Sequence, residues 1–578
     1  MTAHPTATHA ERKSFVSRVT GRGLLVLFVA LAMLLAACGG NGSGTGTAAQ
    51  PSKGPTTLKM ACSPAQGNPD LFNPFFNTNG GAACGNQGFV YETLLYQNLY
   101  TGELKGWLAS SYDLSSDLTT LTFHMQQGVK WSDGQELTSQ DAAFTLNLMK
   151  QYPALDSNGL WSSVIKSVTA PDNSTVTVAL QHPASTAPYL VGAQTFIVPQ
   201  HVWQSVSDPA KFANDTNPIG TGPYKLASHS SQLIKYTKNP GYWGTKPQVD
   251  QIFVPAILSN SAGALAMAKG DLDWLGSGWD PSLDPSFVNK DPQHNHHWFV
   301  PTNTVMLYLN LKKYPFNLLP VRQAISTAIN RNALPQGAAL YAKPASPSGV
   351  VVPTLNSWVS PKYQGQNFTY NPQQAEQYLQ QAGFTKGSDG IYADKSGKKL
   401  SFSLIVVSAW TDWASDTQNI VNDLKKIGID AKINAVSDFS PYFTAMQTGT
   451  FEAGLCWTNG GPTPYYPFQG MLSSGNSAPV GKAVAGTNFE RWSDPATDTL
   501  LKQYESSNDQ NTQKQAIAGL EDIVANQLPS VPITVNVSWD EYTSTHFTGW
   551  PDDTNPYDVG APYNAPNNEM VVLHLKPV

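Results

Sequence analysis

Residues 106–146 constrain the fold of this chain more than any other stretch. Within them, residues 120–125 alternate polar and apolar side chains. This period of two predicts a half-buried strand with Leu121, Phe123 and Met125 turned inward. A hydrophobic pattern this regular requires a core on one side of the strand.

Turns and the start of a helix follow this strand. Gly128 and the Asp133-Gly134 pair bracket a short strand at residues 129–131. Thr138 then caps a helix that carries Asp141 in its first turn, where a carboxylate interacts favourably with the helix dipole. The inward face of the helix is expected to consist of Ala142, Phe144, Leu146 and Leu148. These residues alone predict a hairpin that leads into a helix.

The residue order in this stretch carries a more specific signal. Gly128 to Leu146 reads GVKW.DG..LT..D.AF.L, and this resembles the signature of the large solute-binding proteins of ATP-binding-cassette (ABC) importers. That family includes oligopeptide, dipeptide, nickel and some oligosaccharide receptors. Three further segments of the chain resemble motifs of this family: residues 218–225 (PIGTGPYK), 239–244 (NPGYWG) and 321–331 (VRQAISTAINR). The resemblance implies an α/β, two-lobed periplasmic-binding-protein fold of class II, with an extra subdomain in the first lobe.

Length and composition agree with several domains and a neutral binding surface. The 578 residues exceed the usual size of one core. By resemblance, lobe I spans 57–300 with an inserted subdomain at about 95–210, lobe II spans 301–538, and residues 539–578 return to lobe I. Charged residues are only 13%, whereas Trp, Tyr and Phe number 15, 23 and 23. A net charge of -6 without a Lys/Arg block argues against nucleic acid as a partner.

The N-terminus has the pattern of an export signal. Basic residues precede an uncharged apolar run, Leu24 to Leu35, that is too short to span a bilayer comfortably. The run ends in Leu-Ala-Ala-Cys, which resembles a lipoprotein cleavage site. Residues 1–37 are therefore expected to be removed and Cys38 to carry lipid, with a plain secretory signal cleaved after Ala37 as the alternative.

A flexible tether is expected to follow, over residues 38–56. It consists mostly of Gly, Ser, Thr and Ala and has too little apolar bulk to repay the entropy of ordering. The mature protein is thus expected outside the cytoplasm, anchored to the outer face of the cell membrane. Further along, Cys62 and Cys84 close a short loop in an exported chain, so a disulfide between them is plausible, with Cys456 left as a buried thiol.

The identity of the ligand turns on residues 451–471. In peptide-binding members of the family that this chain resembles, an Asp shortly after a Trp takes the ammonium group of the peptide. Here Trp457 is followed by Thr458, Asn459 and two glycines, without a carboxylate. This departure argues against recognition of a free amine. Aromatic rings and uncharged amides suit a ligand with apolar faces and many hydroxyls, which describes a sugar.

The expected ligand-binding set joins this segment to other aromatic and amide residues. Asn73 and Phe75 stand in the loop after the first strand, which lines the cleft in family members; an ordinary surface turn is the alternative. Residues 547–557 and 569–575 resemble the tail of the oligosaccharide-binding branch. The whole set is Trp457, Asn459, Tyr465, Tyr466, Trp410, Trp413, Asn73, Phe75 and Trp279.

Three classes of function remain to be weighed. A receptor that closes around a small oligomer and delivers it to ABC permease subunits fits best; an oligosaccharide is favoured and an oligopeptide is the alternative. A hydrolase is disfavoured because the chain has no HExxH or GxSxG motif and no assignable pair of carboxylates. A surface adhesin or sensing subunit that lacks a permease is the third class. No cofactor and no metal site are expected, and the protein is expected to be a monomer.

Overall fold

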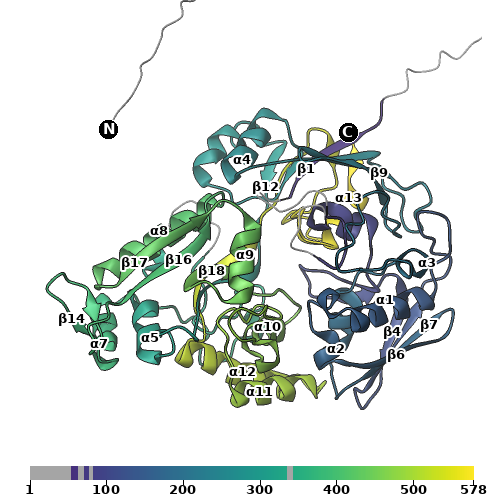
Figure 1. Cartoon of the computed structure of the whole chain (residues 1–578). Helices are drawn as coiled ribbons and strands as arrows, with labels where there is room; N and C mark the ends of the chain where they lie inside the picture. Colours follow the sequence, from purple (N-terminus) through teal and green to yellow (C-terminus); the bar gives the residue numbers. More distant parts are fainter. Residues whose placement is uncertain (1–53, 63–70, 77–81, 335–342) are drawn as a thin grey trace, which may run out of the picture. The chain divides into compact units, whose positions relative to one another are not determined.

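The structure is a computed structural model that describes residues 54–62, 71–76, 82–334 and 343–578 (Figure 1). The chain divides into two units, Met1–Gly54 and Pro55–Val578, and the account below concerns the second unit. The export signal, Cys38 and nearly all of the expected tether lie outside the described residues. Among the helices of the described ranges, none is long and apolar enough to cross a membrane.

A mixed sheet of seven strands forms the frame of lobe I. Its central strand β1 pairs in parallel with β10 on one side and with β11 on the other, and the outer pairs are antiparallel. In spatial order the strands are β12 (Asn295–His297), β20 (Glu541–Thr543), β11 (Trp274–Leu275), β1 (Thr57–Ala61), β10 (Gln251–Pro255), β9 (Leu233–Lys238) and β8 (Tyr224–His229).

A second mixed sheet of five strands forms the frame of lobe II. The strands β16, β17 and β18 are parallel, whereas β13 runs antiparallel to both β18 and β19. In spatial order they are β17 (Asp430–Val436), β16 (Ser401–Val407), β18 (Ala453–Trp457), β13 (Val300–Leu309) and β19 (Val531–Ser538). The second half of β13 and most of β16 and β19 are apolar, which fits the burial of these segments.

The hairpin expected from the sequence lies in a four-stranded antiparallel sheet. In β5 (Thr120–Met125) the side chains of Leu121, Phe123 and Met125 are buried while their neighbours are half-buried, which confirms the alternation. Its other strands are β4 (Ala109–Leu114), β7 (Thr175–Leu180) and β6 (Ile165–Asp172). The helix α1 (Ser139–Gln151) lies across this sheet and packs on β6 and β7 (Figure 1).

Helices cover the sheets and connect their strands. In lobe I and its insertion they are α2 (Leu160–Ser163), α3 (Gln200–Trp203), α4 (Asn260–Lys269) and α13 (Asn567–His574). In lobe II they are α5 (Leu319–Ala328), α7 (Pro372–Gln381), α8 (Thr411–Lys426), α9 (Phe439–Thr448), α10 (Tyr465–Leu472), α11 (Pro495–Glu505) and α12 (Gln510–Gln527). Three small two-stranded pairs complete the fold: β2 (Leu95–Gln97) with β3 (Leu104–Gly106), β14 (Thr385–Lys386) with β15 (Tyr392–Ala393), and β21 (Phe547–Thr548) with β22 (Lys576–Pro577).

Within the described residues, the chain passes between the two large sheets at two points. The first lies between β12 and β13, at Trp298 and Phe299, and the second between β19 and β20, at Trp539 and Asp540. The two crossings are neighbours, because the Trp298 N–H donates to the Asp540 carbonyl oxygen at 2.8 Å. The lobe boundaries expected near residues 300 and 538 remain a proposal, which this change of sheet supports.

Several local expectations need correction. Residues 129–131 form only an isolated bridge between Lys130 and Glu136, because the turn at Asp133-Gly134 already pairs Trp131 with Gln135 and leaves no length for a strand. Phe144 of α1 is half-buried, since alternate positions of a helix do not share one face. The pattern of residues 262–275 predicts a helix with Ala264, Leu265 and Ala268 on one face, but Leu265 of α4 is 54% exposed and the buried face of that helix includes Met267 instead.

The described cysteines are all buried and free. Cys62 and Cys84 are hydrogen-bonded side by side as thiols, and burial raises the pKa of Cys62 well above its ordinary value. The disulfide between them therefore stays a prediction. Cys456 is a fully buried thiol in β18, and burial raises its pKa to about 12.

Candidate functional site

Two adjoining cavities lie where the carboxyl ends of β16, β18 and β19 face lobe I. We call the first the indole cavity, of about 270 Å³, after four of its lining residues: Trp410, Trp413, Trp457 and Trp539. The second is the amide cavity, of about 350 Å³, whose lining includes Asn459, Gln469, Gln194 and Asn567. Both cavities are also lined by the same four residues, Asn303, Trp457, Tyr563 and Asn564. Trp457 thus stands between two connected chambers.

Stacked rings hold Trp457 in place from behind. It ends β18, and its ring lies nearly parallel to those of Phe439 and Phe443 on α9, with interplanar angles of 12° and centroids 6.1 Å apart. Trp410 and Trp413 lie 6.1 and 5.8 Å from it. Because its neighbours are rigid and apolar, the indole of Trp457 is a fixed, half-buried surface.

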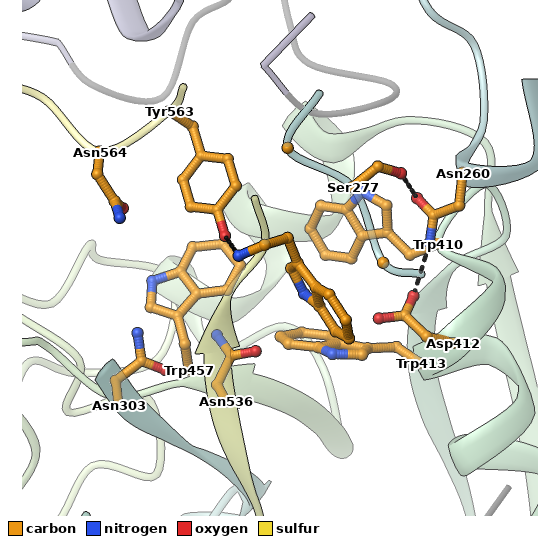
Figure 2. A pocket seen from close by; sticks show the side chains of 13 residues that line it. Asn260, Ser277, Asn303, Trp410, Asp412, Trp413, Trp457, Asn536, Tyr563 and Asn564 are labelled. Atoms are coloured by element: carbon orange, nitrogen blue, oxygen red, sulfur yellow. Dashed lines mark hydrogen bonds between the residues drawn. The ribbon is translucent and has the colours of Figure 1, made fainter. Parts of the chain in front are cut away.

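Two asparagines on adjacent strands form the polar side of the indole cavity. Asn303 on β13 pairs in register with Asn536 on β19, and both side chains line the cavity (Figure 2). The Oδ1 atom of Asn303 is buried without a hydrogen-bond partner among the described residues. A buried acceptor without a donor costs free energy, so this oxygen is suited to a donor group of a ligand.

Lobe I closes the indole cavity with a glycine-containing loop after β11. A Cβ atom on Gly276 would lie 2.7 Å from both the Cys62 carbonyl oxygen and the Tyr563 ring, so only glycine lets these backbones approach. The neighbouring Ser277 hydroxyl donates to Asn260 Oδ1 at 3.1 Å. Tyr563 is oriented by the Trp539 N–H, which donates to its hydroxyl at 2.9 Å (Figure 2).

One carboxylate lines the indole cavity. Asp412 lies in the first turn of α8 in lobe II, and its Oδ1 accepts from Asn260 Nδ2 of lobe I at 2.9 Å. Burial raises the pKa of Asp412 above its ordinary value. One helical turn further, burial and then the charge of Asp412 raise the pKa of Asp416 to about 8.

The amide cavity has no charged side chain among the described residues that line it. Its walls come from both lobes, because Tyr189 of lobe I contacts Tyr466 of α10 with ring centroids 4.4 Å apart. Next to it, the Ser185 N–H of lobe I donates to the Glu505 carbonyl oxygen at 2.7 Å. The lobes therefore touch at both ends of the pair of cavities.

The structure brings together five of the nine residues expected to bind a ligand. Trp410, Trp413 and Trp457 line the indole cavity, and Trp457, Asn459 and Tyr466 line the amide cavity. Whether they contact a ligand stays a prediction.

The other four are placed differently. Tyr465 is fully buried inside lobe II, stacked on Tyr504 and hydrogen-bonded to Glu505. Trp279 is buried and donates to Asp284 Oδ1. Asn73 is fully buried and binds the carbonyl oxygens of Pro209 and Phe212. Phe75 lines a smaller cavity of about 110 Å³ that adjoins the amide cavity, with which it shares Gln194 and Ala565.

Sequence reasoning did not single out Asn260, Asn303, Asp412, Asn536, Trp539 or Tyr563. The sequence does contain a signal for Asp412, because this residue stands between Trp410 and Trp413, which are both expected to bind the ligand. For Asn303 and Asn536 there was none, since only the strand register places them opposite each other.

Two mixed α/β lobes joined by two adjacent crossings, with a ligand-sized cavity between them, define a two-lobed binding protein. Comparison with known proteins gives the family: residues 103–479 match the model of the bacterial extracellular solute-binding proteins, family 5, middle. The chain belongs to this family, whose members serve ABC importers. It is a binding protein rather than an enzyme.

Individual relatives show the range of this family. The chain is 25% identical over 503 residues to the dipeptide-binding protein of Escherichia coli, covering 81% of this chain and 88% of that one. It is 28% identical over 401 residues to the nickel-binding periplasmic protein of the same organism, covering 67% and 73%.

A solved structure adds a third kind of ligand. This is a mannohexaose-bound oligopeptide-binding protein of an ABC transporter from Thermotoga maritima, with a TM-score of 0.80 and 26% identity, covering 91% of this chain and 99% of that one. Proteins similar to this chain thus include ones that bind a peptide, a metal or a sugar. In the described part of this chain, no group of three or more His, Cys, Asp or Glu side chains is arranged to hold a metal ion.

Proposed function

We propose that this protein captures an oligosaccharide in the indole and amide cavities and delivers it to the permease of an ABC importer. The observation that carries the proposal is the chemistry of the cavity walls. Four indoles, three tyrosines and many amides face the ligand space, and no Lys, Arg or His lies among the described residues that line it. Rings bind the apolar faces of a sugar, and amides bind its hydroxyls.

The same walls argue against a free peptide as the ligand. A peptide carries a carboxylate at its C-terminus, and a desolvated carboxylate needs a cationic or multiply hydrogen-bonding partner. The cavities offer no cationic side chain within the described residues. The mannohexaose-bound neighbour supports an oligosaccharide, whereas the dipeptide-binding relative supports the alternative.

Capture is proposed to use closure of the two lobes about their crossings. Two adjacent crossing segments act as a hinge between rigid sheets. A ligand that shifts the protein from 1:99 to 99:1 in favour of the closed form must bind that form more tightly by about 5.5 kcal/mol. Contacts to Trp457 from lobe II and to Tyr563 from lobe I, made together only when the lobes approach, can supply this difference.

A thermal-shift screen tests the choice of ligand. Cello-, malto-, xylo- and manno-oligosaccharides are compared with di- to pentapeptides. A ligand at 100 times its dissociation constant stabilises the protein by about 2.7 kcal/mol. We expect such a shift with at least one oligosaccharide series and not with the peptides. A shift with peptides alone would overturn the proposed ligand class.

The protein is also proposed to be a lipoprotein held at the outer face of the membrane through Cys38. The resemblance of its N-terminus to a lipoprotein signal supports this proposal. The substitution Cys38→Ser removes the acceptor of the lipid, so the variant is expected to leave the membrane fraction. Its retention there would contradict lipidation.

A further inference from the structure

Asp412 is exceptional within the ligand space. Among the described residues that line the indole and amide cavities, it is the one Asp, Glu, Lys, Arg or His. The remaining polar groups are amides and hydroxyls. A single carboxylate in an otherwise neutral cavity needs an explanation, because a charge among apolar rings is costly unless a partner compensates it.

The contacts of Asp412 within the protein leave part of its carboxylate available. Oδ1 accepts from the Asn260 amide at 2.9 Å, and the carboxylate also accepts from the backbone N–H groups of Asp412 and Trp413. Figure 2 shows the other oxygen pointing into the cavity, towards the indole rings. On the lobe I side, Gly278 packs closely against the carboxylate, because a Cβ atom there would lie 2.7 Å from Oδ2.

Helix chemistry explains the position of Asp412 only in part. As an acidic residue in the first turn of α8, it complements the positive end of the helix dipole. An exposed acidic residue would serve that purpose equally well. Burial instead raises the pKa of Asp412, and Asp416 one turn behind it adds a further carboxyl group to the same helix. Neither observation supplies a positive partner.

The rings around Asp412 favour a positive group as well. The Trp410 and Trp413 rings lie 5.3 Å apart with planes at 80°, and Trp457 contacts both. Indole faces carry negative charge density and attract cations, most strongly when the cation is desolvated. The unpartnered Oδ1 of Asn303 lies on the other side of the cavity, beside Trp457, and is an acceptor for a different donor of the ligand (Figure 2). A positively charged hydrogen-bond donor beside Asp412 satisfies both the carboxylate and the rings next to it.

We propose that the indole cavity binds a protonated amine of the ligand, with Asp412 as its counter-ion and the tryptophan rings around it. The inference rests on the proposed function and deepens it. An oligosaccharide with this amine is an oligomer of an amino sugar, whose hydroxyls meet the asparagines while its ammonium group meets Asp412. Such a ligand has no carboxylate, in agreement with the absence of basic side chains from the described cavity walls.

Calorimetry with three matched ligands tests the inference on the full-length protein in detergent. The β1,4-linked tetramers of glucosamine, N-acetylglucosamine and glucose share one backbone and carry an ammonium, an acetamide or a hydroxyl at the same carbon. Because hydrogen bonds to charged groups are the stronger ones, we expect the glucosamine tetramer to bind about 10- to 100-fold more tightly than the others. Asp412→Asn should abolish this preference, so that the three tetramers bind the variant with similar affinities.

Asp438→Asn is the matched control. It removes the same charge from the N-cap of another lobe II helix, α9, at an exposed position outside the described cavity linings. The control should keep the preference. Equal affinities for the three tetramers, or a loss of all binding in folded Asp412→Asn, would overturn the amine at Asp412 and leave the sugar receptor intact.

A peptide arm distinguishes the two proposals. Tetraalanine is measured with a free and with an acetylated N-terminus. If only the free peptide binds, and Asp412→Asn abolishes that binding, the amine at Asp412 stands and the oligosaccharide is overturned. If neither the glucosamine tetramer nor free tetraalanine binds, the amine at Asp412 is wrong.

Discussion

The ring of Trp457 packs on other rings with one side and faces the ligand cavities with the other. On one side Phe439 and Phe443 stack against it, and on the other it faces the two cavities. Its position at the end of β18, next to β13 in register with Val305, fixes the height of the ring in the cavity. A ring that is already immobile loses little entropy when a ligand binds to it.

Trp457→Ala is therefore expected to weaken ligand binding by about tenfold or more while the fold persists. The measurement is calorimetric titration with the ligand found in the screen. Trp492→Ala is a suitable control, because Trp492 is a half-buried indole of lobe II outside the described cavity linings, hydrogen-bonded to Thr497. Unchanged affinity in a folded Trp457→Ala variant would remove this residue from the site.

The sequence gives only part of the site at the level of residues. Trp410, Trp413 and Trp457 could be found because two segments concentrate indoles and one matches a family position. Tyr465 and Tyr466 show the limit of this reasoning. They are adjacent in sequence, yet helix α10 turns Tyr466 to the amide cavity and Tyr465 into the core. The register of β13 and β19 determines the Asn303–Asn536 pair, and register cannot be read from composition.

At the level of elements, the start of α1 shows how a local signal becomes part of the tertiary structure. Asp141 Oδ2 accepts from the Thr138 N–H at 2.9 Å, which closes the first turn. Its other oxygen accepts from the Gln200 N–H at 2.9 Å, which fixes the start of α3. One carboxylate thus satisfies the backbone of two helices.

Asp141→Ala leaves two backbone N–H groups without these acceptors. Each such group costs about 1–3 kcal/mol when it is buried, so the variant is expected to lose about 2 kcal/mol or more of stability. Urea unfolding measures the loss. Gln140→Ala, at the exposed neighbouring position, should change the stability by less than about 0.5 kcal/mol. Equal effects of the two substitutions would contradict this role of Asp141.

Most helices and strands could be predicted where local chemistry and burial agree. The residue patterns predict strands at 57–62, 120–125 and 175–180 and a helix at 372–382, and β1, β5, β7 and α7 (Pro372–Gln381) lie there. Errors arose at the boundaries. The pattern of residues 417–427 predicts a helix from Thr417, whereas α8 begins at Thr411. The difference arises because a periodicity argument counts Asp412 and Trp413 poorly, although tertiary packing buries Trp413.

At the level of the whole molecule, buried carboxyl groups predict an unusual response to pH. Burial raises the pKa of Asp416 to about 8 and of Asp558 to about 7, and it raises the pKa values of Glu490, Asp540, Glu541 and Glu569 as well. Each group holds its proton in the folded state at a pH where the unfolded chain has released it. The stability that these groups contribute is thus fully present below about pH 4, the unfolded pKa, and is lost as the pH rises.

The free energy of unfolding is expected to fall between about pH 4 and pH 8. Exposed carboxylates with lowered pKa values, such as Asp394 at about 2, change the free energy of unfolding only below about pH 4, so they do not affect the trend between pH 4 and pH 8. Thermal unfolding at a series of pH values measures the trend. Asp416→Asn removes one titrating group and should flatten the curve between pH 4 and pH 8. Stability that rises with pH over this range, or an identical slope in Asp416→Asn, would contradict the prediction.

One measurement tests the position of the ligand between the lobes most directly: the crystal structure of the protein with the oligomer from the screen that binds most tightly. The account predicts that the oligomer lies in the indole and amide cavities, against Trp457 of lobe II and Tyr563 of lobe I at the same time. An oligomer that contacts one lobe alone, or that lies outside these cavities, would contradict it.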